Sequence, residues 1–383
     1  MEWRSSLTKR GLVIYPYIPH YRSGVFKRMD DIEGYDFHFV ACPKGVDGIR
    51  TISPTSVRKF TPVNNRHVFA SFWQSGVLRI LRRERPDFVV VLADYRSITS
   101  WVVALWCRFK SVPVFFWAHG WTRTPTGLRD VVKRIYFSLS NLLLLYGNNG
   151  RKFGIESGFP EDRMAVIFNS IESGGRLVPD DENNSMVQAI RKFSSEHWPI
   201  IGAVARLQSA KSPHLIIEAA SELRKTRPEY GEIGVLLVGE GPELENLTTL
   251  AHSLQVPLLA PGASYDSAEL AAFYKAVAVS VIPDRVGLTG VQSMSFGVPV
   301  ISNDSVEGQM PEWEAIRPGE TGDYFPAGDA VGLTDSIARV LEGPSLERLC
   351  VEEYLTNWSP TSQARRIEKV LNSFFDGRST PPV

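Results

Sequence analysis

The sequence predicts an α/β protein made of two domains, each a parallel sheet flanked by helices. Three observations lead to this fold class. Short runs of β-branched and aromatic residues alternate with stretches of helical periodicity, as in repeated strand–helix–strand units. At 383 residues the chain is longer than a typical single domain. A polar, turn-rich stretch between Glu172 and Ser195 separates two patterned regions.

In the first half, five apolar runs are expected to form strands, with helical stretches between them. These strand candidates are Leu12–Tyr15, Tyr35–Ala41, Phe88–Leu92, Val112–Ala118 and Leu142–Tyr146. Between them, Val77–Arg85 has the pattern of a solvated helix that ends before Pro86. The apolar segment Trp101–Lys110 is well short of the roughly 20 residues that span a bilayer.

The second half repeats the alternation of strands and helices. Its expected strands are Ile200–Val204, Gly234–Val238, Leu258–Ala260, Val279–Ile282 and Pro299–Ile301, and its expected helices are Pro213–Lys225, Glu243–Leu254, Ser267–Ala276 and Gly290–Phe296. We therefore expect two Rossmann-like domains, residues 1–178 and 199–359, joined by a linker at 179–198.

The composition is that of an ordinary globular protein, but the charge is divided unevenly. Hydrophobic residues make up 43% and charged residues 22%, which excludes disordered and coiled-coil classes. Residues 1–176 contain 26 Lys and Arg against 14 Asp and Glu, whereas residues 177–383 contain 16 against 28. The basic half is expected to meet an anion, either a phospholipid surface or a phosphate-bearing substrate. Nucleic acid is not expected, because no nucleic-acid-binding motif accompanies the charge.

The three cysteines predict neither a disulfide framework nor a metal site. Cys42, Cys107 and Cys350 are odd in number and far apart, which favours a reducing compartment. The apolar run that follows Arg10 is too short to direct export. We expect a cytoplasmic protein, with peripheral attachment to the inner face of the cell membrane as an additional hypothesis.

Two cations follow the expected strand Ile200–Val204, where the carboxyl end of a parallel strand delivers residues to a ligand. Arg206 can bind two phosphate oxygens at once, and Lys211 can act as a mobile point charge. The pair therefore suits a diphosphate. A solvated loop with two ordinary charges is the alternative interpretation.

Two glycine-bearing turns follow other strands of the second half. Gly239 lies in a turn that lacks a phosphate-loop pattern, so we expect mainly a structural turn whose backbone approaches a ligand. The free amides of Gly287, Leu288 and Thr289 would lie at a helix N-terminus, which suits an anion. Asp284 precedes this terminus.

The segment from Gly202 to Leu341 contains a series of short motifs in a fixed order. These motifs are Arg206-Leu-Gln-Ser-Ala-Lys211, Leu237-Val-Gly-Glu-Gly-Pro242, Leu259-Ala-Pro261-Gly262, Ser295-Phe-Gly-Val-Pro-Val300, Pro311-Glu312 and Gly319-Glu-Thr-Gly322. In their order and spacing the segment resembles the donor-binding domain of retaining glycosyltransferases with the GT-B fold, family 4, also called group 1. The resemblance implies a GT-B protein that binds a nucleotide-diphosphate sugar on its second domain, with Gly239, Pro261 and Gly262 near the nucleotide.

The family's Glu-x7-Glu motif falls on Asp284 and Gln292 in this chain. The resemblance implies that Asp284 contacts the donor sugar and that Gln292 holds the ribose. A glutamine still bonds a ribose diol, but without charge assistance, and aspartate is one methylene shorter than glutamate. The variant Gln292→Glu would distinguish two interpretations of this departure. A large gain in turnover would indicate that glutamine weakens the enzyme, and no gain would indicate a site adapted to glutamine.

In the first half the resemblance covers fewer residues. It implies a catalytic role near the transferred sugar for His119, which follows a strand, and a contact with the diphosphate for Gly24. It also implies that a helix at 360–376 packs back on the first domain. As alternatives, His119 is an ordinary polar residue after a strand, and Asn169-Ser-Ile171 marks only the end of the domain.

We therefore expect a retaining glycosyltransferase that transfers a sugar to a lipid-linked or saccharide acceptor, with no cofactor. No Asp-x-Asp sequence occurs, so no metal is expected. A set of basic and aromatic residues suggests docking at an anionic membrane face: Arg79, Arg82, Arg83, Arg85, Trp101, Trp106, Arg108 and Lys110. The alternative is that Trp101 and Trp106 lie in the core and the arginines only solvate the surface. Two alternatives stay open: a GT-B sugar-nucleotide epimerase, and a donor-binding or partner subunit that does not catalyse.

Overall fold

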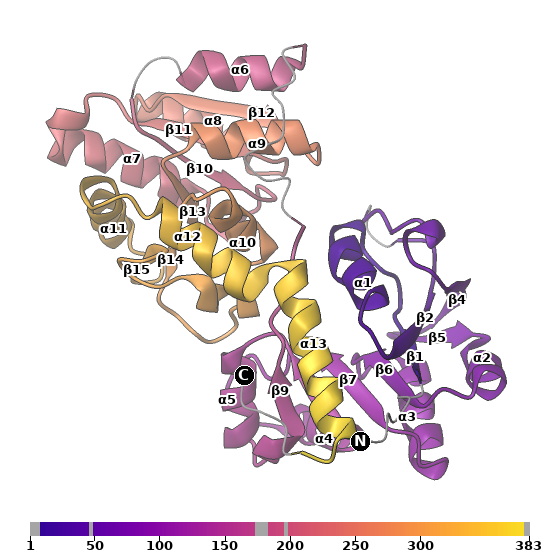
Figure 1. Cartoon of the computed structure of the whole chain (residues 1–383). Helices are drawn as coiled ribbons and strands as arrows, with labels where there is room; N and C mark the ends of the chain where they lie inside the picture. The colour runs from indigo at the N-terminus through magenta and orange to yellow at the C-terminus, as the bar shows by residue number, and fades with distance from the viewer. Residues whose placement is uncertain (1–7, 46–48, 173–182, 195–197, 379–383) are drawn as a thin grey trace, which may run out of the picture. The chain divides into compact units, whose positions relative to one another are not determined.

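A computed structural model divides the chain into two compact units (Figure 1). The first unit comprises Met1–Glu172 and Ser359–Val383, and the second comprises Ser173–Trp358. The second unit is thus inserted between the main part of the first unit and the last described helix, which belongs to the first unit. The residues that the structure describes are 8–45, 49–172, 183–194 and 198–378. None of the described helices is long and apolar enough to cross a membrane.

The first unit contains a seven-stranded parallel sheet in the order β3-β2-β1-β6-β7-β8-β9, and a separate antiparallel hairpin, β4–β5. The described strands are β1 Lys9–Ile14, β2 Tyr35–Ala41, β3 Phe60–Pro62, β4 Asn64–Val68, β5 Ser71–Ser75, β6 Phe88–Leu92, β7 Val114–Ala118, β8 Leu142–Leu145 and β9 Met164–Val166. The described helices are α1 Ser23–Asp30, α2 Val77–Glu84, α3 Ile98–Phe109, α4 Leu128–Ser138, α5 Asn148–Glu156 and α13 Pro360–Phe375.

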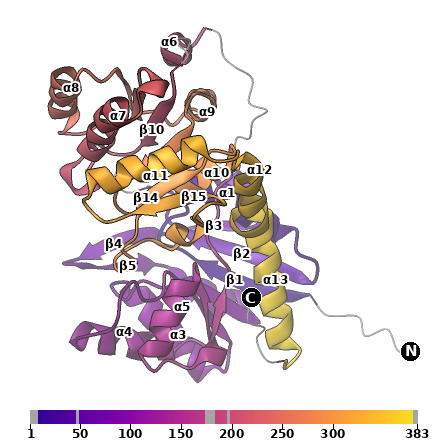
Figure 2. The same cartoon turned by 90° about the vertical axis from the view of Figure 1, so that its left-hand side faces the viewer.

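Helices cover both faces of this sheet, because its strands are apolar on both sides. Side chains alternate between the faces along a strand. On β7, Phe115 packs toward α13, with 4.9 Å between the ring centroids of Phe115 and Phe374. The next residue, Phe116, points to the other face and contacts Tyr136 of α4 at 4.7 Å. Figure 2 shows α3, α4 and α5 together beneath the sheet.

The last helix, α13, completes the core of the first unit. It buries Ile367, Val370 and Leu371 against the sheet. Its Asn372 accepts a hydrogen bond of 2.7 Å from the hydroxyl of Tyr35, the first residue of β2. A segment almost 200 residues away from the rest of the unit therefore supplies part of its hydrophobic core.

The second unit contains a six-stranded parallel sheet in the order β12-β11-β10-β13-β14-β15. The described strands are β10 Ile200–Val204, β11 Gly234–Val238, β12 Leu258–Gly262, β13 Val279–Ile282, β14 Val300–Asn303 and β15 Gly322–Phe325. The described helices are α6 Ser185–Ser194, α7 His214–Thr226, α8 Leu244–Ser253, α9 Ser267–Ala276, α10 Leu288–Ser295, α11 Ala330–Glu342 and α12 Glu347–Glu353.

Helix α6 corrects the expected linker at 179–198. The helix buries Val187 and Ile190 in the same core cluster as α9, so its apolar stripe makes it part of the second unit. Of the remaining linker positions, 179–182 and 195–197 lie outside the described residues.

Four short strand features in the structure were not expected from the sequence: β3, the β4–β5 hairpin, β9 and β15. The hairpin has a polar sequence and is fixed by long-range contacts. The buried Gln74 of β5 donates a hydrogen bond of 2.9 Å to the carbonyl of Tyr15, next to the end of β1. Its backbone N–H bonds to Thr99 of α3 at 2.6 Å. These partners lie too far away in the chain to leave a local pattern.

Candidate functional site

In the second unit, the predicted donor-site residues lie at the carboxyl edge of the sheet. Strand β10 has β11 on one side and β13 on the other, so the connections leaving it diverge to opposite sides. A crevice for a ligand forms at such a switch point in open α/β sheets. Arg206 and Lys211 follow β10, and Asp284 follows β13.

The structure brings Lys211 and Asp284 together. The Lys211 Nζ lies 3.6 Å from a carboxylate oxygen of Asp284 and 3.4 Å from the carbonyl oxygen of Arg285. Both side chains are about one-third exposed, at 34% and 35%. Such an open ion pair contributes little to stability, so a charged ligand can replace either partner at low cost.

Arg206 is exposed in the loop after β10. Its guanidinium has no hydrogen bond or ion pair with any residue that the structure describes. An arginine in this state offers all five of its N–H donors to a ligand. The loop continues into a short turn, Ser209–Lys211, that positions Lys211 beside Asp284.

Gly239 packs against this loop. A Cβ at Gly239 would lie 1.8 Å from the carbonyl oxygen of Ala205, so only glycine allows the two backbones to approach this closely. The Gly239 amide donates to the carbonyl of Gly262, at the end of β12, at 2.9 Å. Gly239 therefore shapes the loop that carries Arg206. Contacts of Gly239, Pro261 and Gly262 with a nucleotide stay a prediction.

The loop between β13 and α10 is held by two buried amides that sequence analysis missed. Gln309 accepts a hydrogen bond of 3.0 Å from the Val286 N–H and donates one of 3.3 Å to the Asp284 carbonyl. Asn303 donates one of 2.8 Å to the Pro283 carbonyl. Both amide side chains are buried. Asn303 could have been found from the sequence, because it lies at the end of β14, the strand next to β13.

Helix α10 begins at Leu288, and no side chain among the described residues caps its N-terminus. Gly287 occupies the cap position. The amides of Gly287, Leu288 and Thr289 have no intrahelical acceptor and can bind an anion. Gln292, one turn further along, is half-buried. The structure does not test its contact with a ribose.

The first unit has a second cluster of candidate side chains, at the carboxyl edge of its own sheet. His119 follows β7, and its ring centroid lies 4.7 Å from that of Tyr146. Gly120, next to it, has a left-handed φ of 71° that favours glycine. A Cβ at Gly150 would lie 2.6 Å from the carbonyl oxygen of His119. The backbone of His119 is thus closely packed, while the residue keeps an exposed surface.

Arg22 is a buried cation in this cluster that sequence analysis did not identify. It is 6% exposed and donates a hydrogen bond of 3.0 Å to the Tyr15 hydroxyl and another to Asn169 Oδ1. Its guanidinium lies 4.8 Å from the ring centroid of Tyr146 and 5.5 Å from that of Trp117. No carboxylate among the described residues forms an ion pair with it, so positive charge remains at this edge of the sheet.

Lys133 of α4 holds the loop that carries His119. Its Nζ donates a hydrogen bond of 2.6 Å to the Gly120 carbonyl and lies over the rings of Trp121 and Phe137. Burial lowers the pKa of Lys133. Desolvation by the surrounding residues of the first unit lowers the pKa of His119, and the positive charges of Arg22 and Lys133 lower it further. His119 is therefore neutral at neutral pH and can accept a proton.

We expect this low pKa to be visible in a proton NMR titration of the His119 ring, assigned by comparison with His119→Gln. The midpoint should lie at least about one unit below the 6.5 of an ordinary histidine. Lys133→Met and Arg22→Met should each raise it, because each removes a nearby positive charge. Arg28→Met, on α1, is the control. A wild-type midpoint at or above 6.5 would contradict this electrostatic description.

Gly24 lies in the first turn of α1 and is closely packed. A Cβ there would lie 2.0 Å from Glu172 Oε2 and 2.8 Å from Pro360 Cγ. The absence of a side chain thus serves packing within the first unit. A contact between the Gly24 amide and a diphosphate stays a prediction.

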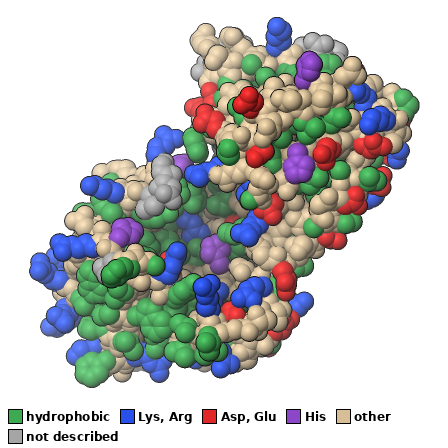
Figure 3. Space-filling model, turned by 180° about the vertical axis from the view of Figure 1, so that it is seen from behind, with side chains coloured by type: hydrophobic (Ala, Val, Ile, Leu, Met, Phe, Trp, Pro, Cys, Tyr) green, Lys and Arg blue, Asp and Glu red, His purple; other side chains and the backbone are tan. Residues whose placement is uncertain are grey.

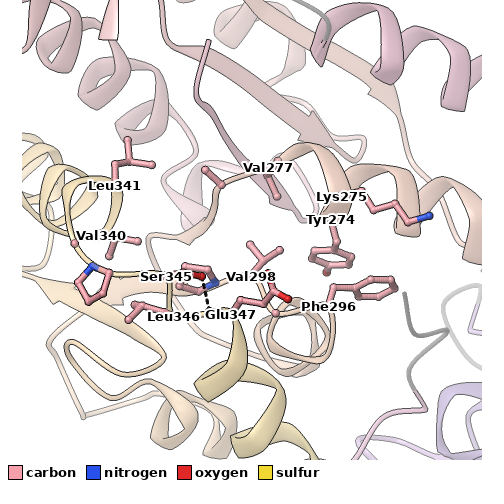
Figure 4. A pocket seen from close by; sticks show the side chains of 15 residues that line it. Tyr274, Lys275, Val277, Phe296, Val298, Val340, Leu341, Ser345, Leu346 and Glu347 are labelled. Atoms are coloured by element: carbon pink, nitrogen blue, oxygen red, sulfur yellow. Dashed lines mark hydrogen bonds between the residues drawn. The ribbon is translucent and has the colours of Figure 1, made fainter. Parts of the chain in front are cut away.

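A pocket of about 640 Å³ opens elsewhere in the second unit (Figure 4). It lies at the amino edge of the sheet, because Ala278 and Pro299, which line it, directly precede β13 and β14. Tyr274, Phe296 and Leu346 form part of its apolar wall. None of the predicted donor-site residues lines it.

Comparisons with known proteins agree with this description. Residues 187–355 match the family model described as glycosyl transferases group 1. The chain is 31% identical over 235 residues to a D-inositol 3-phosphate glycosyltransferase of Acidothermus cellulolyticus, which covers 57% of this chain and 49% of the relative. It is 23% identical over 285 residues to a GDP-mannose-dependent alpha-(1-6)-phosphatidylinositol monomannoside mannosyltransferase of Mycolicibacterium smegmatis, which covers 68% of this chain and 69% of the relative. The chain thus spans about half the length of the first of these relatives.

Solved structures match almost the whole chain. The lipopolysaccharide outer core galactosyltransferase WaaB has a TM-score of 0.69 at 13% identity, with 96% of this chain and 99% of that chain covered. HepE from Anabaena in complex with UDP has a TM-score of 0.71 at 14% identity, with 95% and 100% covered. These matches confirm the predicted fold class, GT-B, with two Rossmann-like units.

Proposed function

We propose that this chain is a group 1 glycosyltransferase that transfers a sugar from a nucleotide-diphosphate sugar to an acceptor hydroxyl. The observation that carries the proposal is the set of groups at the carboxyl edge of the second unit. Two adjacent strands are followed there by Arg206, which has no partner among the described residues, by Lys211 in an open ion pair, and by a helix N-terminus that no described side chain caps. The family match over residues 187–355 supports the same reading.

In this proposal the second unit stabilises the leaving group. The bond between the sugar C1 and the diphosphate oxygen breaks, a bond from C1 to the acceptor oxygen forms, and a nucleoside diphosphate and the acceptor proton are released. Arg206, Lys211 and the amides at 287–289 would stabilise the negative charge that develops on the diphosphate. Asp284 would then be released from Lys211 to bond the sugar hydroxyls. We propose that the reaction retains anomeric configuration and needs no metal.

The acceptor is proposed to carry phosphate, as in a lipid-linked intermediate. Two features support this class. Arg22 and Lys133 keep positive charge beside His119 in the first unit. The printed names of the two sequence relatives specify an inositol phosphate and a phosphatidylinositol mannoside. His119, neutral and partly exposed, would contact the transferred sugar.

Thermal unfolding with nucleotides tests the donor site. UDP, GDP, ADP, CDP and their common sugar conjugates are compared at saturating concentration. One base should raise the melting temperature by roughly 5 °C, because a ligand that binds only the folded state stabilises it. The shift should be lost in Arg206→Ala and kept in Gln208→Ala, a change in the same loop. No shift with any nucleotide would contradict the proposal and favour a non-catalytic partner subunit.

Once the nucleotide is known, an assay with the matching nucleotide sugar distinguishes transfer from epimerisation. With the matching nucleotide sugar, a transferase releases nucleoside diphosphate. A sugar-nucleotide epimerase releases an altered nucleotide sugar and needs no acceptor. Conversion without release of nucleoside diphosphate would therefore overturn the proposed function in favour of the epimerase.

A further inference from the structure

Large exposed hydrophobic side chains are concentrated on two helices of the first unit. Of the thirteen such residues among those described, seven lie on α3 and α4. We call these seven residues the α3–α4 patch: Ile98, Leu105, Phe109, Leu128, Val131, Val132 and Ile135. Scattered exposed hydrophobics are ordinary, but a contiguous apolar group marks an interaction surface.

The patch residues have helical spacing on each of the two helices, and the helices contact each other. On α3, Leu105 and Phe109 are four residues apart, and Ile98 lies seven residues before Leu105. On α4, Leu128 and Ile135 have the same spacing of seven. The helices are joined through Tyr136 of α4, whose hydroxyl donates a hydrogen bond of 2.7 Å to Ser100 Oγ and whose ring contacts Trp101 at 4.8 Å.

These side chains are truly outside the core. Phe109 is 81% exposed and Leu128 is 85% exposed. Helix α3 uses a different stripe, including Val103 and Cys107, to cover the sheet. Helices α3 and α4 therefore carry apolar residues on their outer faces in addition to their buried ones, which an ordinary solvated helix avoids.

Positive charge surrounds the patch. Residues 94–135 contain seven Lys and Arg but only two acidic residues. Both acids are already engaged: Asp94 pairs with Arg96 at 2.9 Å, and Asp130 accepts from the Thr126 backbone at 2.9 Å. Figure 3 shows hydrophobic side chains gathered in the lower part of the view, with Lys and Arg at their border.

Three of these cations are free to meet a ligand. Arg108, Lys110 and Arg129 are exposed and form no ion pair with the residues that the structure describes. Lys110 lies over the Phe109 ring at 5.2 Å, so an exposed aromatic side chain and a cation share one site.

Of the two groups expected from the sequence to face a membrane, only the one at residues 101–110 contains large exposed hydrophobic side chains. Helix α2, with its four neighbouring arginines, buries Val77, Ile80 and Leu81 and has no large exposed hydrophobic residue. Trp101 is half-buried and its indole N–H bonds to the Tyr95 carbonyl at 2.9 Å. The large exposed hydrophobic side chains of this region are therefore those of the α3–α4 patch, and Trp101 is held by its own loop.

We propose that the α3–α4 patch docks on an anionic phospholipid bilayer. The aliphatic and phenyl side chains enter the boundary between headgroups and acyl chains, and Arg108, Lys110 and Arg129 meet lipid phosphates. A bilayer fits better than a protein partner, because the core of a protein interface is depleted of charge and this patch lies among free cations. The inference concerns binding only and does not rest on the proposed sugar transfer.

Vesicle flotation tests the apolar part of the proposal. The full chain is mixed with vesicles of phosphatidylcholine alone or of phosphatidylcholine with phosphatidylglycerol. It should float with the anionic vesicles only. The triple variant Leu105→Ser, Phe109→Ser, Leu128→Ser should bind at least about tenfold more weakly, because each change removes apolar surface from the membrane. The matched control is Ile155→Ser, Tyr265→Ser, Val331→Ser, three exposed hydrophobic residues elsewhere, which should bind like the wild type.

Charge variants test whether the cations near α3 and α4, and not those near α2, meet the membrane. Arg108→Gln, Lys110→Gln, Arg129→Gln should reduce flotation about tenfold or more, whereas Arg79→Gln, Arg82→Gln, Arg85→Gln near α2 should leave it near the wild-type level. High salt should also release the wild type. Unchanged melting temperatures show that each variant is folded.

Three outcomes would overturn the proposal. The first is wild-type protein that does not float with anionic vesicles at low salt. The second is equal loss in the patch variant and its control. The third is a wild-type dimer in sedimentation velocity that the patch variant lacks, since the patch would then be an interface between two copies of the chain.

Discussion

Replacing Arg206 with alanine is expected to lower kcat/KM for the nucleotide sugar by about 100- to 1000-fold, the loss typical for one preorganised donor at a developing negative charge. The physical reason is that, in the proposed reaction, the Arg206 guanidinium would meet the diphosphate without first leaving another partner. Among the described residues its guanidinium is unpaired, whereas Lys211 already has Asp284 at 3.6 Å. The measurement is the rate of nucleoside diphosphate release with the donor that stabilises the protein.

Two variants sharpen this experiment. Arg206→Lys keeps the charge but loses the two-pronged geometry, so it should recover only part of the rate. Gln208→Ala changes the same exposed loop and should leave the rate within about twofold, the range of ordinary surface substitutions. An Arg206→Ala rate equal to that of Gln208→Ala would show that the diphosphate binds elsewhere.

Replacing Gly239 with alanine is expected to have the second large effect, on stability and ligand binding together. The new methyl group would lie 1.8 Å from the Ala205 carbonyl oxygen. Strand β11 or the Arg206 loop must then move, which endangers the hydrogen bond of 2.9 Å from the Leu207 N–H to the Glu240 carbonyl. We expect a loss of about 2 kcal/mol or more in unfolding free energy, as for other overpacked sites.

Urea unfolding and nucleotide-induced thermal shift measure the two consequences. Gly127→Ala is the matched control, because nothing lies within 4 Å of a Cβ at that position and its φ is extended. It should change neither stability nor nucleotide binding appreciably. If Gly239→Ala unfolds at the wild-type urea concentration and still binds nucleotide, the close packing of these loops is not required for the site.

The strands that could be predicted are those with long apolar runs. The expected segment Ile200–Val204 coincides with β10, and Phe88–Leu92 coincides with β6. Such runs are recognisable because a parallel strand is buried on both faces. The first strand was expected at Leu12–Tyr15 but extends over Lys9–Ile14, since its polar start is fixed by pairing with β2 and not by its own composition. The hairpin β4–β5 and helix α6 depend in the same way on distant contacts.

In the candidate site, too, some residues could be predicted from the sequence and others could not. Arg206, Lys211 and Asp284 could be placed from sequence because they follow strands directly in a recognisable motif order. Arg22 and Gln309 could not. Arg22 reaches Asn169, 147 residues away, and Gln309, which follows β14, bonds to the Asp284 carbonyl, 25 residues earlier. Contacts between segments so far apart leave no local pattern in a single sequence.

The position of α13 has a consequence for how the chain is made. Its residues 367, 370 and 371 belong to the core around β1 and β2, yet they are translated after the whole second unit. During synthesis the first unit therefore leaves the ribosome with part of its apolar core uncovered. It must wait in an incomplete state while about 190 further residues emerge, at rates of roughly 5–20 residues per second. The core of the first unit can therefore close only after helix α13 has been synthesised.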